Sequence, residues 1–150
     1  YWNNDRATAD KFKGDWLVTG DTGRMDREGY LWFGGRDDDV ITSAGYRIGP
    51  AEIEDCLLRH PAVQMAAAIG VPDPLRTEAV KACVVLNPGF AASDSLAADL
   101  QDHVKSRLAA HEYPRIVEFI NSLPMTTTGK IVRRALRQQA VDRIERGEKP

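Results

Sequence analysis

The sequence has few of the features that mark secreted, membrane-spanning or metal-binding proteins. Its only cysteines, Cys56 and Cys83, lie in apolar contexts and form no CxxC pair, so neither a disulfide framework nor a cysteine-based metal site is expected. No apolar run approaches the roughly 18 residues of a membrane-spanning helix. The first residues also lack the basic and apolar regions of a signal peptide. These absences predict a reduced, cytoplasmic protein with no membrane span and no metal site in this chain.

Neither sign of charge dominates the composition. The 20 basic and 22 acidic residues give a formal charge of −2, which does not favour a nucleic-acid partner. Positive charge collects at the end, since residues 130–150 hold seven basic and three acidic side chains. The 150 residues, 43% of them hydrophobic, suffice for one domain, or for a smaller domain with a strip of another. The sequence does not begin with methionine, and we expect a piece of a longer protein.

The order of β-prone and helix-prone segments predicts an α+β fold. Residues 16–42 alternate short β-prone runs with Gly- and Asp-containing turns, as antiparallel hairpins do. A helix should begin at Pro50, with Glu52 and Glu54 at its positive end, and finish near residue 60. Further on we expect two core strands at 63–71 and 78–86, another strand at 115–120, and amphipathic helices at 94–110 and 131–145. The sequence therefore predicts a small sheet with packed helices, preceded by a β-rich strip.

Two clusters in the first third of the chain have side chains suited to a nucleotide. Asp21 follows Thr19-Gly20 at a predicted strand end, where a carboxylate can accept two ribose hydroxyls, each bond contributing about 1.5 to 3 kcal/mol. Taken alone, this tripeptide is more often a turn. Arg36 precedes three aspartates, 37–39, which fit a solvated turn, a hinge or a calcium loop. The distal Glu of an EF-hand is missing, so the calcium loop ranks last.

The remaining clusters present a glycine, a guanidinium and a lysine. Gly45 and Arg47 follow a predicted strand, and their combination suits a narrow channel or a phosphate. The threonine-rich segment 124–130 ends in Lys130 but lacks the glycine spacing of a Walker loop, and Ile131 stands where Ser or Thr is required. A lysine on such a loop is most often simply solvated.

In order along the chain, four motifs resemble those of the adenylate-forming acyl-CoA synthetases. They are TGD at 19–21, GRDDDVI at 35–41, SAGYRIGPAEIE at 43–54 and PMTTTGKIVRR at 124–134. YPRIVEF at 113–119 is similar to the medium-chain and aromatic acyl-CoA synthetase branch. The resemblance implies that residues 37–150 form the mobile carboxyl-terminal AMP-binding enzyme domain. It also implies that residues 1–36 are the last β-rich strip of a large amino-terminal domain, which is otherwise missing.

The resemblance also implies a reaction and roles for individual residues. The full enzyme would convert a carboxylic acid, ATP and CoA into acyl-CoA, AMP and pyrophosphate, with Mg²⁺ accompanying ATP but no ligand for it assigned here. This fragment alone would be inactive. By similarity Lys130 would be catalytic, Asp21 and Arg36 would bind the nucleotide, Asp38 would be the hinge, and Gly45, Tyr46 and Arg47 would bind CoA. The sequence departs from commoner family forms at Ala44 and Met125.

Two other functions remain open from the sequence. The same motifs would serve an adenylation domain that loads the phosphopantetheine of a carrier protein. A non-catalytic interaction module with a basic final helix would explain the positive charge of residues 130–150 but none of the four motifs. No base-stacking aromatic accompanies the arginines of that helix.

Overall fold

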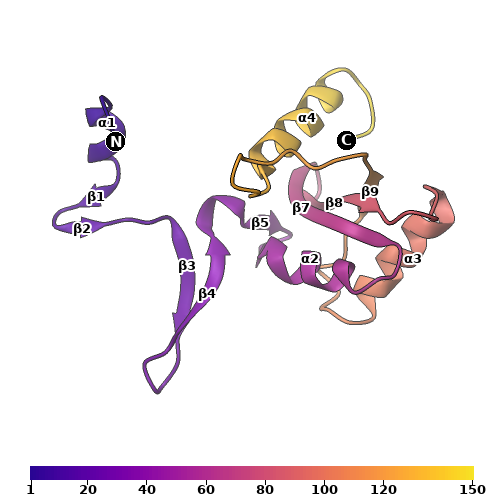
Figure 1. Ribbon diagram of the computed structural model, residues 1–150, viewed down its shortest axis with the longest axis horizontal. Coiled ribbons are helices and arrows are strands. Elements are labelled where there is room, and N and C mark those ends of the chain that lie inside the picture. The colour runs from indigo at the N-terminus through magenta and orange to yellow at the C-terminus, as the bar shows by residue number, and fades with distance from the viewer. The chain divides into compact units, whose positions relative to one another are not determined.

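The computed structural model describes residues 1–150 and divides into two compact units, Tyr1–Asp38 and Asp39–Pro150. The first unit contains helix α1 (Asp5–Ala9) and two antiparallel pairs, β1 (Phe12–Lys13) with β2 (Trp16–Leu17) and β3 (Asp21–Met25) with β4 (Leu31–Arg36) (Figure 1). The predicted hairpins are therefore present. Strand β2 ends at Leu17, and α1 was not expected.

The first unit has no buried core. None of its residues is buried, and its large apolar side chains are exposed, among them Trp2, Trp16, Leu31 and Phe33. An isolated two-stranded hairpin is marginally stable in water because it buries too little apolar surface. The hairpins of this unit therefore gain little stability from the burial of apolar surface within this chain.

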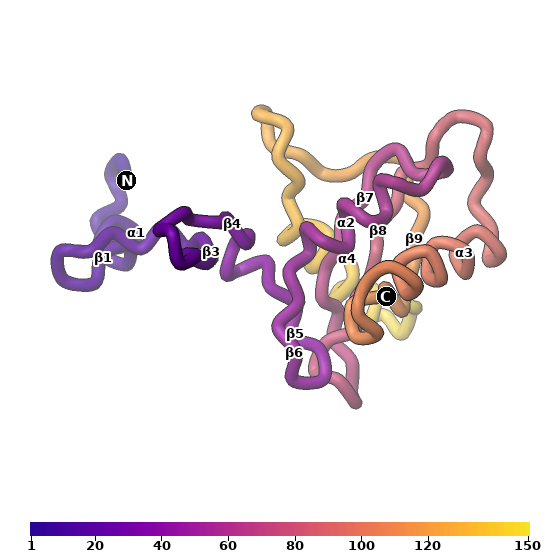
Figure 2. The backbone as a smooth tube through the Cα atoms, turned by 90° about the horizontal axis from the view of Figure 1, so that it is seen from below, coloured from indigo at the N-terminus to yellow at the C-terminus, as the bar shows by residue number.

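The second unit is a five-stranded sheet flanked by helices, which confirms the predicted α+β fold. The strands are β5 (Ile41–Ser43), β6 (Tyr46–Ile48), β7 (Val63–Asp73), β8 (Thr77–Leu86) and β9 (Ile116–Phe119), and the helices are α2 (Pro50–Leu58), α3 (Asp94–Lys105) and α4 (Arg133–Glu145). Strand order is β6-β5-β8-β7, with β9 parallel to β8. In Figure 2 the β5–β6 hairpin lies beside the β7–β8 turn, where the Ala44 N–H donates to the Arg76 carbonyl at 2.8 Å.

The central strands are buried on both faces, which explains their continuous apolar sequence. One face of β8, with Val80, Ala82 and Val84, packs with residues of α2 and α3. The other face, with Ala79 and Cys83, packs with residues of α4. In Figure 1, α4 accordingly lies across β7 and β8 from α2. No helix of the structure is both long enough and apolar enough to cross a membrane.

Local signals place the starts of α2 and α3 correctly, but not the end of α3 or the start of α4. Pro50 opens α2, and the Ser93 hydroxyl caps α3 by accepting from the Leu96 N–H at 3.1 Å. The predicted helix over 94–110 was too long, since α3 ends at Lys105. The final helix starts at Arg133 rather than 131, because Ile131 instead pairs with Met125 in a β-bridge.

Candidate functional site

The structure joins the three side chains expected at the nucleotide and the hinge in one chain of ion pairs within the first unit. Asp21 and Arg36 are register partners across β3 and β4. Nη1 of Arg36 lies 3.1 Å from Oδ1 of Asp21 and donates to the Thr19 carbonyl, while its Nε donates to Asp38 at 3.0 Å. The hydrogen bond with Asp38 and the charges of both aspartates raise the pKa of Arg36. Asp38 itself lies within a short 3₁₀ helix, Asp37–Asp39.

Gly20 allows this close approach of the guanidinium. Its φ is +81°, and a Cβ there would lie 3.2 Å from Nη2 of Arg36. The motif Thr19-Gly20-Asp21 leads directly into β3, with no turn assigned at Thr19 or Gly20, and the positive φ of Gly20 is where the backbone makes room for Arg36.

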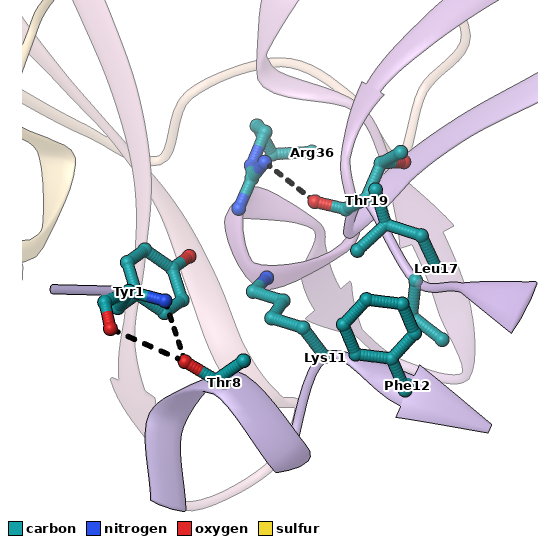
Figure 3. A pocket seen from close by; sticks show the side chains of 8 residues that line it. Tyr1, Thr8, Lys11, Phe12, Leu17, Thr19 and Arg36 are labelled. Atoms are coloured by element: carbon teal, nitrogen blue, oxygen red, sulfur yellow. Dashed lines mark hydrogen bonds between the residues drawn. The ribbon is translucent and has the colours of Figure 1, made fainter. Parts of the chain in front are cut away.

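A surface hollow of about 370 Å³ lies next to Arg36 within the first unit. Figure 3 shows Arg36 and Thr19 hydrogen-bonded at one side of it, with the ring of Phe12 and the side chain of Leu17 at another. Its complete lining is Tyr1, Thr8, Lys11, Phe12, Leu17, Val18, Thr19 and Arg36. The hollow thus combines an apolar wall with two cationic side chains.

The residues expected at the CoA side form a tight hairpin in the second unit. Ala44 and Gly45 are the two turn residues between β5 and β6, with φ of +50° and +84°. Positive φ at both positions is the signature of a type I′ turn, for which glycine is favoured. No atom lies within 4 Å of a Cβ built on Gly45. The glycine therefore meets a backbone requirement of this unit, independently of any ligand.

Tyr46 and Arg47 follow the turn on β6. The Tyr46 ring stacks on His111, with centroids 3.9 Å apart and planes 10° from parallel. Arg47 is exposed and pairs in register with Thr42. His111 was not expected here from the sequence, because nothing local indicates that it lies beside a residue so distant in the chain.

Lys130 lies on an exposed loop that is held by its own hydrogen bonds. The Thr126 N–H donates to the Lys130 carbonyl at 2.8 Å, and the Lys130 N–H donates to the Thr126 hydroxyl at 3.1 Å. The two ends of the loop are joined by the Val132 N–H, which donates to the Pro124 carbonyl at 2.8 Å. The Lys130 ammonium has no hydrogen bond or ion pair within the chain. The backbone of this loop is thus held by hydrogen bonds, whereas the Lys130 side chain is exposed.

Two buried charged residues were not assigned a role from the sequence. Glu54 was expected only to suit the positive end of a helix, whereas its carboxylate is buried, accepts from the Ala68 N–H and pairs with Arg133. Lys81 lies in β8, within the core strand predicted at 78–86. Its side chain is 2% exposed and pairs with Glu118 at 2.6 Å. The position of Lys81 within an apolar strand could have predicted a buried carboxylate partner, because a buried ammonium needs one.

Comparison with known proteins identifies the family. A family model described as the AMP-binding enzyme C-terminal domain matches residues 52–130. The chain belongs to the AMP-binding enzyme C-terminal domain family. The match begins within α2, includes the β7–β8 hairpin, α3 and β9, and ends at Lys130. The predicted membership of the adenylate-forming enzymes is thereby confirmed.

Proteins similar to this AMP-binding C-terminal domain include acyl-CoA synthetases and a CoA ligase. Human acyl-coenzyme A synthetase ACSM1, mitochondrial, is 52% identical over 93% of this chain, which covers 24% of that protein. The solved acyl-CoA synthetase of Brucella canis is 52% identical, with a TM-score of 0.70 over 88% of this chain and 24% of that one. The anthranilate CoA ligase AuaEII, solved with anthranoyl-AMP, is 42% identical, with a TM-score of 0.83 over 93% of this chain and 27% of that one. The chain thus spans about a quarter of the length of its relatives.

Proposed function

We propose that this chain is the carboxyl-terminal part of an AMP-forming acyl-CoA synthetase. The enzyme joins a carboxylic acid to CoA with conversion of ATP to AMP and pyrophosphate. The observation that carries the proposal is Lys130, an unpaired ammonium on an ordered, exposed loop at the end of the family match. The names of the relatives favour CoA over the phosphopantetheine of a carrier protein as the acceptor.

Lys130 promotes the first half-reaction by placing its charge between two anions. The carboxylate of the acid attacks the α-phosphorus of ATP, a new carboxyl-phosphate bond forms, and pyrophosphate leaves with the electrons of the broken P–O bond. Carboxylate and phosphate repel each other, and an ammonium about 4 Å from each contributes roughly 4 kcal/mol per contact at an effective dielectric constant of 20. The ammonium therefore stabilises the transition state, in which the two anions come together.

The first unit contributes to nucleotide binding in this proposal. Asp21 accepts the two ribose hydroxyls, and Arg36 holds the Asp21 carboxylate in place through their ion pair. The lack of any buried residue in this unit supports its assignment as a strip of the large amino-terminal domain. We assign residues 1–36 to that domain and 37–150 to the mobile one. The compact units divide two residues later, after Asp38. Mg²⁺ accompanies ATP, and no residue of this chain is assigned to it.

The second half-reaction uses the other side of the mobile domain. The domain turns about Asp38, and the β5–β6 hairpin then faces the CoA thiol, which attacks the acyl carbonyl and releases AMP. The bare backbone of Gly45 leaves room for the pantetheine arm. Tyr46 and Arg47 continue the same surface toward the nucleotide end of CoA. The acid and phosphate pockets lie outside this chain, so the fragment alone is inactive.

The structure weakens the alternative of a nucleic-acid-binding module. Four arginines between residues 133 and 146 form ion pairs with acidic side chains of the same unit: Arg133, Arg137, Arg143 and Arg146. The last helix therefore presents much less free positive charge than its composition indicates. The reduced, cytoplasmic setting remains a prediction. Both cysteines are free, while several relatives are named as mitochondrial.

Lys130→Ala in the full-length enzyme tests the proposal, with Lys149→Ala, an exposed lysine, as the matched control. Acid-dependent pyrophosphate release should fall by about 100-fold or more, as expected when about 3 kcal/mol of transition-state stabilisation is lost. Thioester formation from supplied acyl-adenylate should stay near the wild-type rate in both variants. Equal loss of both half-reactions, or adenylation unaffected by Lys130→Ala, would contradict the proposed role.

A further inference from the structure

The start of helix α4 is held by a buried cluster of charges that the proposed reaction does not use. Arg133 lies three residues after Lys130. Its Nε and Nη2 donate to the two carboxylate oxygens of Glu54 at 3.0 and 2.6 Å, and its Nη1 donates to Asp39 at 2.9 Å. Arg137, one helical turn later, lies 3.5 Å from the same Asp39 carboxylate. We call Asp39, Glu54 and Arg133 the clamp.

All three side chains of the clamp are largely buried. The side chains of Arg133, Asp39 and Glu54 are 18%, 17% and 11% exposed. Burial alone would lower the pKa of Arg133, but the hydrogen bonds and charges of Glu54 and Asp39 outweigh it and raise that pKa. A bidentate guanidinium pair of this kind fixes direction as well as distance, which a single ammonium does not.

The first turn of α4 has little else to fix it. Val132, at the N-cap, provides no side-chain hydrogen bond, and the turn contains no acidic residue. A cation at the positive end of a helix is also unfavourable. The buried contacts of α4 come later, at Leu136 and Ala140. The clamp is therefore the main polar attachment of the point where the lysine loop enters its helix.

The three clamp residues lie next to three segments to which the proposed function assigns different roles: the hinge, the CoA-binding hairpin and the lysine loop. Asp39 directly follows the proposed hinge residue Asp38 and begins the second unit. Glu54 lies on α2, just after the β5–β6 hairpin. Arg133 directly follows the loop that carries Lys130, whose base is closed at Val132.

We infer that Arg133 is a positioning residue for adenylation, which fastens the base of the Lys130 loop to the residue after the hinge. The lysine loop then moves as one body with Asp39 and α2 whenever the second unit changes its orientation. This inference rests on the proposed function, because it acts through Lys130. Arg133 itself touches no substrate.

The test uses Arg133→Gln, Arg133→Lys and Asp39→Asn in the full-length enzyme, with Arg134→Gln as control. Arg134 is the next residue of the same turn, is exposed and has no ion pair. Arg133→Gln should lower kcat for acid-dependent pyrophosphate release by about 10- to 100-fold, the effect of displacing a catalytic group by about 1 Å. KM for ATP should change little, because the lost interaction acts in the transition state. Arg133→Lys should recover part of the loss, and Arg134→Gln should match wild type.

Two further measurements separate positioning from folding. Asp39→Asn leaves the Glu54 pair intact, so it should keep a melting temperature near wild type and still slow adenylation. Thioester formation from supplied acyl-adenylate should stay within about 3-fold of wild type in every variant, since Lys130 is not required there. Equal slowing of both half-reactions, or normal adenylation in both Arg133→Gln and Asp39→Asn, would overturn the inference.

The same assays distinguish this inference from the proposed function. If wild-type enzyme releases no acid-dependent pyrophosphate, or Lys130→Ala releases it normally, the proposed function fails and the clamp role fails with it. If Lys130→Ala is inactive while the clamp variants adenylate normally, only the clamp role is wrong.

Discussion

The buried Lys81–Glu118 pair makes a sharp prediction about stability. Lys81 Nζ lies 2.6 Å from Glu118, and the lysine side chain is 2% exposed, whereas that of Glu118 is 22% exposed and also pairs with Arg143. The two partners are therefore not equivalent. Removing the carboxylate strands a buried ammonium, while removing the ammonium leaves a carboxylate that still has an arginine and some water.

The expected magnitudes follow from this asymmetry. Glu118→Gln should lower the free energy of unfolding by about 3 to 5 kcal/mol, the cost of a buried charge without its partner. Lys81→Met keeps a long apolar chain in the strand and should cost within about 1 kcal/mol. The double variant Lys81→Met/Glu118→Gln should be more stable than Glu118→Gln alone, because the stranded charge is gone.

Urea denaturation of the 150-residue chain measures these differences, since the second unit contains all of its buried residues. With a slope of about 2 kcal/mol per molar urea, Glu118→Gln should lower the midpoint by roughly 1.5 to 2.5 M. Equal costs for the two single variants would refute the reasoning, because they would mean that Lys81 reaches water when its partner is lost.

The difference in unfolding free energy between wild type and Glu118→Gln should depend on pH in one direction. Burial raises the pKa of Glu118, but the hydrogen bonds and charges of Lys81 and Arg143 outweigh it and lower that pKa. Its stabilising contribution is therefore complete above the unfolded value of about 4.3 and is lost as pH falls through the lower folded value. The gap in stability between wild type and Glu118→Gln should be constant near neutral pH and shrink below about pH 4.

Three further substitutions test other parts of the chain. Gly70→Ala should lower the free energy of unfolding by about 1 to 3 kcal/mol in urea titrations. The added Cβ would lie 2.5 Å from the Glu78 carboxyl group, which accepts a hydrogen bond from the Thr42 N–H. An unchanged urea midpoint would show that the Glu78 side chain can move freely. Ala44→Gly should raise stability by up to about 1 kcal/mol by relieving a φ of +50°, and a lower melting temperature would contradict this. Asp38→Pro in the full-length enzyme should slow thioester transfer far more than adenylation in rapid-quench assays, because a fixed φ opposes the hinge motion; equal rates would argue against a hinge at this residue.

Features that depend on neighbouring residues could be predicted from the sequence. Pro50 and Ser93 mark helix starts because φ restriction and capping involve only the next few residues. The apolar runs of β7 and β8 indicated buried strands, and the four ordered motifs indicated the family that the comparison confirms. The roles proposed for individual motif residues, such as Lys130, rest on the chemistry of their side chains.

Features that join distant segments were decided only by the tertiary structure. Arg133 meets Glu54 and Asp39 across 79 and 94 residues of chain. Lys81 meets Glu118 because β9 pairs parallel to β8, with Cys83 opposite Glu118. No local period or cap specifies such pairings, since they depend on which strands become neighbours and in which register. The sequence determined which charges are present, and the packing of the sheet against its helices determined which of them are buried together.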